Sequence, residues 1–176
     1  VQTGIGRTGK LFAYQWEEIT PDVMAIAKGL GGGFPIGAVV ATNKAAAGMT
    51  PGTHGSTFGG NFLATSVAKS VITQVIENNI LDNVINIGNH LLKTIDLLST
   101  QYPKLIKGVR GKGLMIGIIC NMNNADLCSN LRNEGLLSVP AANNILRLLP
   151  PLNITTEHAD ACINILKYTL EKLEVN

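Results

Sequence analysis

The sequence is poor in charged and aromatic residues and has no long hydrophobic run. Charged residues make up 15% of its 176 residues, aromatic residues make up 5%, and the formal net charge is +2. So small a net charge gives no electrostatic reason to expect a nucleic acid or an anionic membrane as a partner. No stretch of about 18 apolar residues occurs, so no membrane-spanning helix is expected. With 45% hydrophobic residues, the composition is that of a globular protein.

Cysteine is also scarce. Cys120, Cys128 and Cys162 form no Cys-x-x-Cys pair, and their odd number argues against a disulfide framework. We expect all three to be small buried apolar residues of a protein in a reducing, cytoplasmic setting. No signal peptide is expected, because the first residues lack a charged region followed by an apolar one. His54 has no partner at metal-ligand spacing, so no metal site is expected.

Glycine, by contrast, is abundant in the first sixty residues, where it surrounds two short apolar runs. Residues 23–27 precede a lysine and a glycine loop, and residues 36–41 follow that loop. Because both runs are short, apolar and bounded by turn residues, they predict buried strands.

A helical pattern begins at Asn61, a suitable N-cap. Apolar residues recur at three-and-four spacing from Leu63 to Ile76, and two asparagines then separate this helix from a second one that ends before Pro103. Beyond the proline, apolar patterns and turn residues predict strands at 113–120 and 145–149 and helices at 125–133 and 155–173. The sequence therefore predicts an α/β fold with two zones, about 1–60 and about 103–176, and a helical pair between them as a spacer.

Lys28 is the first candidate for chemistry. It follows an apolar run and precedes Gly29, and a lysine at the end of a buried strand is partly desolvated. Desolvation disfavours the ammonium form and favours a nucleophilic amine that can form a Schiff base with an aldehyde cofactor. Taken alone, such a lysine is more often a solvated strand-end residue.

The segment from Gly4 to Leu11 matches two nucleotide-binding patterns on paper. It reads G-x-G-x-x-G and also G-x-x-x-x-G-K. Leu11 stands where the second pattern needs Ser or Thr for magnesium, and only three residues precede Gly4 where the first pattern needs a strand. Nucleotide or phosphate binding by this loop is therefore the weaker alternative.

Two further segments carry groups suited to anions. Ser56 and Thr57 lie just ahead of the helix that begins after Asn61, where hydroxyls and unpaired backbone N–H groups either bind an anion or cap the helix. Arg147 lies inside an apolar strand that ends at Pro150, and its planar guanidinium suits a carboxylate, either of a ligand or of an internal ion pair.

Together these segments resemble the class III pyridoxal-phosphate aminotransferases. The resemblance rests on four segments in the family's order. They are residues 1–14, residues 20–38 around Ala27-Lys28-Gly29-Leu30-Gly31-Gly32-Gly33, residues 51–61, and Arg147 with Pro150-Pro151-Leu152. It implies a fold-type I transferase, in which 1–77 is the end of the large cofactor domain, 78–102 is a connecting helix and 103–176 is the small C-terminal α/β domain.

The resemblance also implies residue roles. Lys28 would hold pyridoxal 5'-phosphate as a Schiff base and then shuttle a proton. Val1 and Gln2 would contact the cofactor, Gln2 at its phenolic oxygen, and Thr57 would bind its phosphate across the interface of a homodimer. Ser56 would lie near the substrate, and Arg147 would bind the substrate α-carboxylate.

Within the family, the lysine segment and residues 52–61 look most like acetylornithine aminotransferases. This implies amino transfer from N-acetylornithine to 2-oxoglutarate in arginine biosynthesis, although ornithine, succinyl-diaminopimelate and 4-aminobutyrate are related donors. The family's Asp-Glu pair would lie just before Val1, so we read the chain as a fragment that is inactive on its own or as a non-catalytic remnant. The strand at 23–27 would then be central in a parallel sheet.

Overall fold

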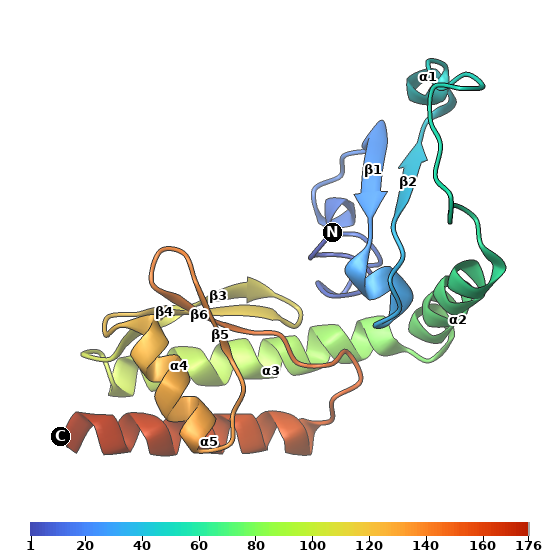
Figure 1. The fold of residues 1–176 in the computed structure, drawn as a ribbon. Helices are drawn as coiled ribbons and strands as arrows, with labels where there is room; N and C mark the ends of the chain where they lie inside the picture. The colour runs from blue at the N-terminus through green and yellow to red at the C-terminus, as the bar shows by residue number, and fades with distance from the viewer. Residues whose placement is uncertain (176) are drawn as a thin grey trace. The chain divides into compact units, whose positions relative to one another are not determined.

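The strands of the computed structural model form two separate sheets, one in each of two units (Figure 1). Residues 1–175 are described. The units are Val1–Leu81 and Asp82–Asn176, and each is described by itself.

The sheet of the first unit has two strands, β1 (Val23–Ile26) and β2 (Ala38–Ala41). They run antiparallel, with Val23 opposite Ala41 and Ile26 opposite Ala38. The connection between them is too short for the crossover that parallel strands need, so an antiparallel pair is the natural result. The expectation that the strand at 23–27 is central in a parallel sheet concerns other neighbouring strands and stays a prediction. The strand positions are confirmed, but the expected burial is not, because Val23 is 55% exposed and Val39 is 65% exposed.

Short helices and one long helix complete the first unit. The short ones are η1 (Ala13–Trp16), η2 (Lys28–Gly31) and α1 (Asn43–Ala46), and the long one is α2 (Phe62–Glu77). The Asn61 side chain accepts a hydrogen bond of 2.8 Å from the backbone N–H of Ala64, which confirms the expected N-cap. The helix ends where Asn79 adopts a φ of 55°, a conformation that asparagine tolerates better than most residues.

The second unit contains a four-stranded antiparallel sheet in the order β3-β4-β6-β5. Its strands are β3 (Ile106–Lys112), β4 (Met115–Cys120), β5 (Val139–Ala141) and β6 (Ile145–Leu148). The predicted strands at 113–120 and 145–149 correspond to β4 and β6. The sequence did not predict β3 and β5. In β3, glycines and cations interrupt the apolar residues, and β5 has only three residues.

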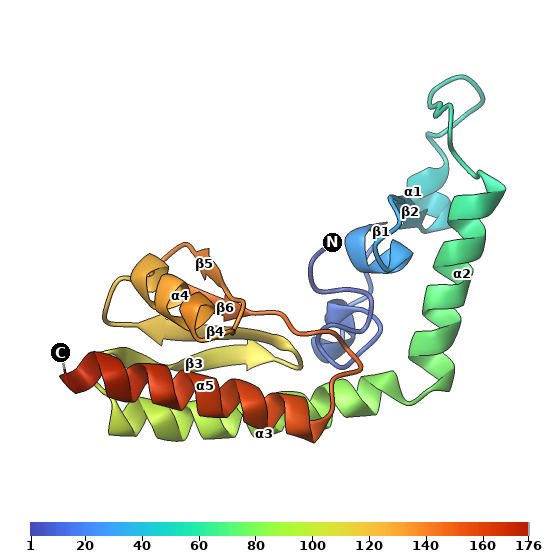
Figure 2. The same cartoon turned by 60° about the horizontal axis from the view of Figure 1, so that its bottom comes forward.

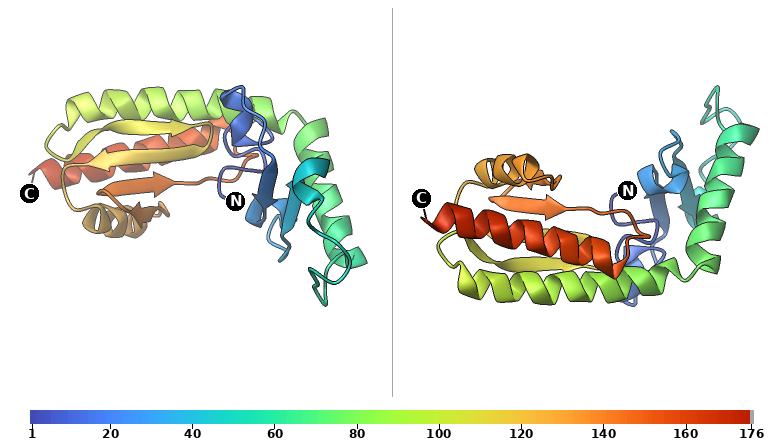
Figure 3. Two further views of the ribbon diagram at one scale, coloured as in Figure 1. Left: turned by 90° about the horizontal axis from the view of Figure 1, so that it is seen from above. Right: turned by 90° about the horizontal axis from the view of Figure 1, so that it is seen from below.

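Helices α3 (Ile80–Gln101) and α5 (Thr156–Val175) lie side by side along one face of this sheet (Figures 2 and 3). The core between helices and sheet is built from side chains that are almost wholly buried. Among them are Leu91, Ile95, Ile116, Ile118, Leu146, Leu166 and Leu170. The remaining helix, α4 (Asn124–Asn133), packs against β5, β6 and α5. The three helices confirm the predicted positions in this half of the chain.

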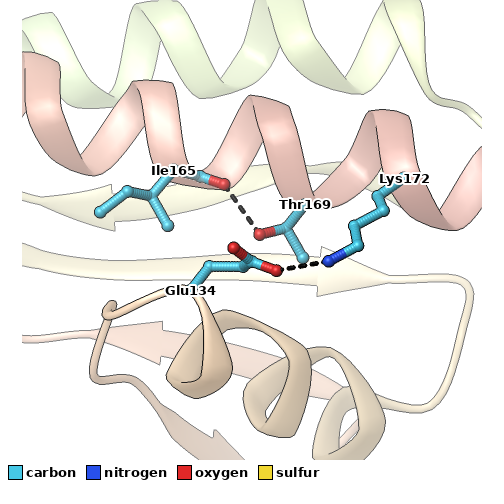
Figure 4. Close-up of polar contacts among 4 residues, drawn as sticks. All are labelled: Glu134, Ile165, Thr169 and Lys172. Carbon is cyan, nitrogen blue, oxygen red and sulfur yellow. Dashed lines mark hydrogen bonds and ion pairs between the residues drawn. The ribbon is translucent and has the colours of Figure 1, made fainter.

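Helix α5 makes two polar contacts, one within the helix and one with the end of α4 (Figure 4). The Thr169 hydroxyl, although buried, donates a hydrogen bond of 2.8 Å to the Ile165 carbonyl one turn earlier, so its polarity is satisfied within the helix. At the helix end, Lys172 Nζ lies 2.7 Å from Glu134 Oε1 and links α5 to the residue that ends α4. Such exposed ion pairs contribute little stability, so the apolar core holds this unit together.

The three cysteines are free, and Cys120 and Cys128 are buried as expected, whereas Cys162 is half-buried. Within residues 1–175, no helix is long and apolar enough to cross a membrane.

Candidate functional site

Lys28 lies at a sharp change of backbone direction. β1 ends at Ile26, Ala27 is extended, and Lys28 then takes a φ of 50° as the first residue of η2. A left-handed conformation costs a residue with a side chain about 1–2 kcal/mol, so surrounding contacts must hold it there. Its side chain is exposed in this structure, so the expectation of a desolvated strand-end lysine is wrong here.

Two glycines that follow Lys28 provide close contacts around the turn. A Cβ on Gly29 would lie 3.3 Å from the Gly4 carbonyl oxygen, and a Cβ on Gly32 would lie 2.9 Å from Val71 Cγ2. Gly32 also has a φ of 54°. The missing side chains therefore let the lysine loop approach both the amino-terminal loop and helix α2. In this way the structure brings together two of the segments that the sequence analysis selected, residues 1–14 and 20–38, and packs the second of them against α2.

The loop from Gly4 to Leu11 is a series of turns. Gly6 and Gly9 have φ values of 77° and 90°, and the Gly6 N–H donates to the Leu11 carbonyl at 3.1 Å. The four-residue η1 follows this loop. A dinucleotide or P-loop site presents the phosphate to the N-terminus of a helix that follows the loop, and a single four-residue turn does not supply such a helix, so the nucleotide-binding alternative lacks this part of its structural context.

Lys10, the lysine of this loop, packs against the Trp16 ring. Lys10 Nζ lies 5.1 Å from the centroid of the Trp16 ring, and Trp16 Nε1 donates to the hydroxyl of the buried Thr8 at 3.3 Å. Cation–π contact and hydrogen bond together fold η1 back onto the loop. Lys10 therefore belongs to the local packing of the loop.

Val1 and Gln2, the other predicted cofactor residues of this unit, lie at the start of the chain. Val1 lines a cavity of about 220 Å³ that also contacts Ile26 and Ala27, the two residues before Lys28. Gln2 is exposed. The structure thus places Val1 near the lysine turn, whereas the cofactor contacts of both residues stay predictions.

Ser56 and Thr57 lie in an exposed loop that leads to α2. The Gly59 N–H donates to the Ser56 carbonyl at 3.1 Å, which forms a turn just before Asn61. No hydrogen bond or ion pair joins either hydroxyl to Lys28 within residues 1–175. The predicted role of Thr57 across a dimer interface therefore stays a prediction.

Arg147 belongs to the second unit and lies in the middle of β6. It pairs in register with Gly117 on β4 and Val139 on β5. Because successive side chains of a strand point to opposite faces, Arg147 lies on the face opposite to the buried Leu146 and Leu148. This alternation explains how the charge is accommodated in an apolar strand.

The arginine lines two cavities of its unit. One has a volume of about 450 Å³ and is mostly apolar, with Ser138 and Cys162 among its lining residues. The Ser138 hydroxyl is buried and has no hydrogen-bond partner within residues 1–175, and burial raises the pKa of the Cys162 thiol to about 11. The other cavity, of about 480 Å³, lies on the open face of the sheet and includes Arg110. The sequence analysis missed Arg110, because the signal that could have revealed it, a strand at Ile106–Lys112, was not recognised.

Comparison with known proteins gives a consistent result. The model of the aminotransferase class-III family matches residues 1–170. The chain belongs to the class III aminotransferase family. It is 46% identical to the acetylornithine aminotransferase of Brucella melitensis over 175 residues, which are 99% of this chain and 43% of that protein.

Solved structures agree in fold. The acetylornithine aminotransferase of Elizabethkingia anophelis superposes with a TM-score of 0.92 and 40% identity, covering 98% of this chain and 44% of that chain. The ornithine δ-aminotransferase of Plasmodium falciparum superposes with a TM-score of 0.93 and 34% identity, covering 100% of this chain and 46% of that chain. The fold-type I assignment is thereby confirmed, and the chain spans less than half the length of these relatives.

Class III aminotransferases depend on pyridoxal phosphate, and several features of this chain fit that cofactor. Lys28 offers an exposed amine that has no hydrogen bond or ion pair within residues 1–175. The exposed hydroxyls of Ser56 and Thr57 precede the N-terminus of the 16-residue helix α2, which attracts phosphate. No group of three or more His, Cys, Asp or Glu residues suited to a metal ion occurs in the described part of the chain.

Proposed function

We propose that the protein transfers an amino group from N-acetylornithine, or a related ω-amino acid, to 2-oxoglutarate. Lys28 carries this proposal, because it lies on the strained turn between β1 and the glycine loop in a chain that the family model matches over residues 1–170. The donor is taken from relatives that are named acetylornithine aminotransferases at 46% identity. The reaction would belong to arginine biosynthesis in the cytoplasm.

Lys28 has two tasks in this proposal. Its Nζ would attach the protein to the aldehyde of pyridoxal phosphate, a cofactor that serves as an electron sink when bound. The same Nζ would move a proton to and from the substrate carbon that bears the amino group. The exposed position of Lys28 leaves the amine accessible to both partners.

Other residues would hold cofactor and substrate in place. Thr57 would bind the cofactor phosphate from the partner subunit of a homodimer, and Gln2 and Val1 would contact the cofactor ring. Ser56 would lie beside the substrate. Since Thr57 is exposed and precedes a helix N-terminus, its hydroxyl and the nearby backbone N–H groups can converge on a phosphate.

Arg147 would bind the α-carboxylate that donor and acceptor share. Two parallel hydrogen bonds from the guanidinium fix both the position and the orientation of a carboxylate. β6 is paired on both sides, by β4 and β5, so its backbone is well suited to hold that guanidinium in place.

The test is an assay of the complete protein with 2-oxoglutarate and a series of amino donors. We expect N-acetylornithine to give the highest kcat/KM, with ornithine, succinyl-diaminopimelate and 4-aminobutyrate below it. A different order would change the donor, and a protein that binds pyridoxal phosphate without turnover on any of them would be a non-catalytic remnant. Gel filtration with and without the cofactor would test the homodimer.

A further inference from the structure

The Asn83 side chain ties the loop that follows β6 to the first turn of helix α3. Its Nδ2 group donates two hydrogen bonds, one of 2.9 Å to the Leu152 carbonyl and one of 3.0 Å to the Ile154 carbonyl. Because both partners are acceptors, the amide must turn its NH2 group toward them, which fixes the orientation of the side chain. Asn83 therefore holds two residues that lie 69 and 71 positions further along the chain.

The backbone of this loop is not suited to hold itself in place. Pro150 and Pro151, which follow β6, carry no N–H and cannot extend the pairing of that strand. The Ile154 N–H donates to the Pro151 carbonyl at 3.4 Å, a long hydrogen bond that closes a turn. The Asn83 amide supplies two fixed points within the loop, at the carbonyls of Leu152 and Ile154.

The same loop forms part of the wall beside Arg147. The cavity of about 450 Å³ that Arg147 lines is also lined by Pro150, Pro151 and Ile154. A shift of the loop therefore changes the shape of a cavity that the arginine lines. Such a shift matters for a bound ligand, because a misplacement of about 1 Å can weaken a site by about 100-fold.

We propose that Asn83 is a positioning residue for carboxylate binding at Arg147. The proposal rests on the proposed function, in which Arg147 binds the substrate α-carboxylate. With both hydrogen bonds of Asn83 in place, the loop keeps the conformation that completes the cavity. Without them, the loop adopts that conformation for only a fraction of the time, and the apparent affinity for a carboxylate falls by the same fraction.

Two variants remove the donor group in different ways. Asn83→Ala removes the amide, whereas Asn83→Asp keeps its shape but offers only acceptors to the two carbonyls. Asn83 lies in the first turn of α3, where a negative charge is favourable, so the aspartate does not disturb the helix itself. Asn86→Asp is the matched control, because Asn86 is exposed on the same helix about one turn later.

Two measurements on the complete protein loaded with pyridoxal phosphate follow the loop and the ligand separately. Hydrogen–deuterium exchange over residues 149–155 reports on the loop. Isothermal titration calorimetry with 2-oxoglutarate reports on binding without turnover, because no amino donor is present.

We expect both Asn83 variants to exchange faster over the loop than the wild type. They should bind 2-oxoglutarate about 5-fold more weakly or worse, through the loss of two hydrogen bonds. The kcat at saturating substrates should stay within about 2-fold, because a bound ligand selects the ordered loop. Asn86→Asp should match the wild type in all three measurements.

The proposal is overturned if loop exchange is unchanged in both Asn83 variants, or if it rises while 2-oxoglutarate binding and kcat stay the same. It is also overturned if kcat falls with unchanged binding, or if Asn83→Asp weakens binding and a folded Asn83→Ala does not, since the added charge would then be the cause. Should Asn83→Ala not fold, Asn83→Asp measured against Asn86→Asp carries the test.

Failure of the proposed function would look different. In that case amino transfer by the wild type would fail with every donor, or Arg147→Lys would bind 2-oxoglutarate as tightly as the wild type. Weaker binding in the Asn83 variants together with intact amino transfer in the wild type would support both proposals.

Discussion

Between the two units, buried apolar side chains are distributed unequally. In Val1–Leu81 they are Ile5, Leu30, Ala64, Ala68 and Val75, whereas Asp82–Asn176 buries large side chains from three helices and three of its four strands. The first unit exposes many of its large apolar residues, among them Val23, Val39, Val40, Phe58 and Phe62. The first unit therefore buries less of its own apolar surface than the second.

The difference matters for the predicted site residues, which are divided between the two units. Lys28 and Thr57 lie on glycine-rich loops of the unit with the small core, and Arg147 lies on a strand of the unit with the large core. Loops can carry strained backbone and exposed reactive groups, while a packed sheet holds a guanidinium in a fixed direction. The following predictions test whether the two units differ in this way.

The largest effect is expected for Lys28→Ala. Loss of the attaching amine should lower turnover by about 100-fold or more, because both covalent attachment and proton transfer depend on it. Borohydride reduction of the complete protein followed by peptide mapping should place the pyridoxyl label on Lys28. Lys44→Ala, at an exposed lysine of the same unit, should keep both label and turnover. A label on Lys10 or Lys112 would show that the assignment is wrong.

Next comes the core of the second unit. Leu166 is fully buried on α5, so Leu166→Ala should lower the free energy of unfolding by about 2–5 kcal/mol. Leu97→Ala removes the same atoms from a side chain that is 54% exposed and should change stability by less than about 0.5 kcal/mol. Urea unfolding measures both. Equal losses would mean that the core is not where this structure places it.

Arg147→Lys should weaken binding of the amino donor and the 2-oxo acid together. A lysine keeps the charge but cannot form the bidentate pair, so we expect a loss of about 1.5–3 kcal/mol for each ligand. Titration with a substrate analogue of each class measures it. Arg132→Lys, at an exposed position near the end of α4, is the control. If only one ligand class were affected, the shared carboxylate could not be what Arg147 binds.

The smallest effect concerns the backbone of the lysine loop. Gly32→Ala forces a side chain into a left-handed conformation and against Val71, which should cost about 1–2 kcal/mol. Gly48→Ala is the control, since a Cβ there meets nothing within 4 Å. Thermal unfolding of the complete protein compares them. A Gly32→Ala protein that melts with the wild type would show that the loop does not pack against α2 as described.

Local signals in the sequence were sufficient for most of the second half of the chain. The Asn61 cap, the apolar spacing and Pro103 predicted α2 and α3, and apolar patterns with turn residues predicted α4 and α5 to within a few residues, because such helices are defined by their own periodicity. The same kind of signal failed for β3, where Gly108 and Gly111 interrupt the pattern. It therefore also missed Arg110, which lies on that strand.

The sequence by itself determined the family, the α/β class and the identity of the candidate residues, because ordered motifs are read along the chain. Only the tertiary structure decided which of these residues share a surface. Gly29 approaches Gly4 beside the left-handed turn at Lys28, and strand pairing places Arg110 and Arg147 on one face of the sheet, on either side of Gly117. The tertiary structure also decided which residues are buried, since an apolar strand such as β1 is buried only where another element covers it.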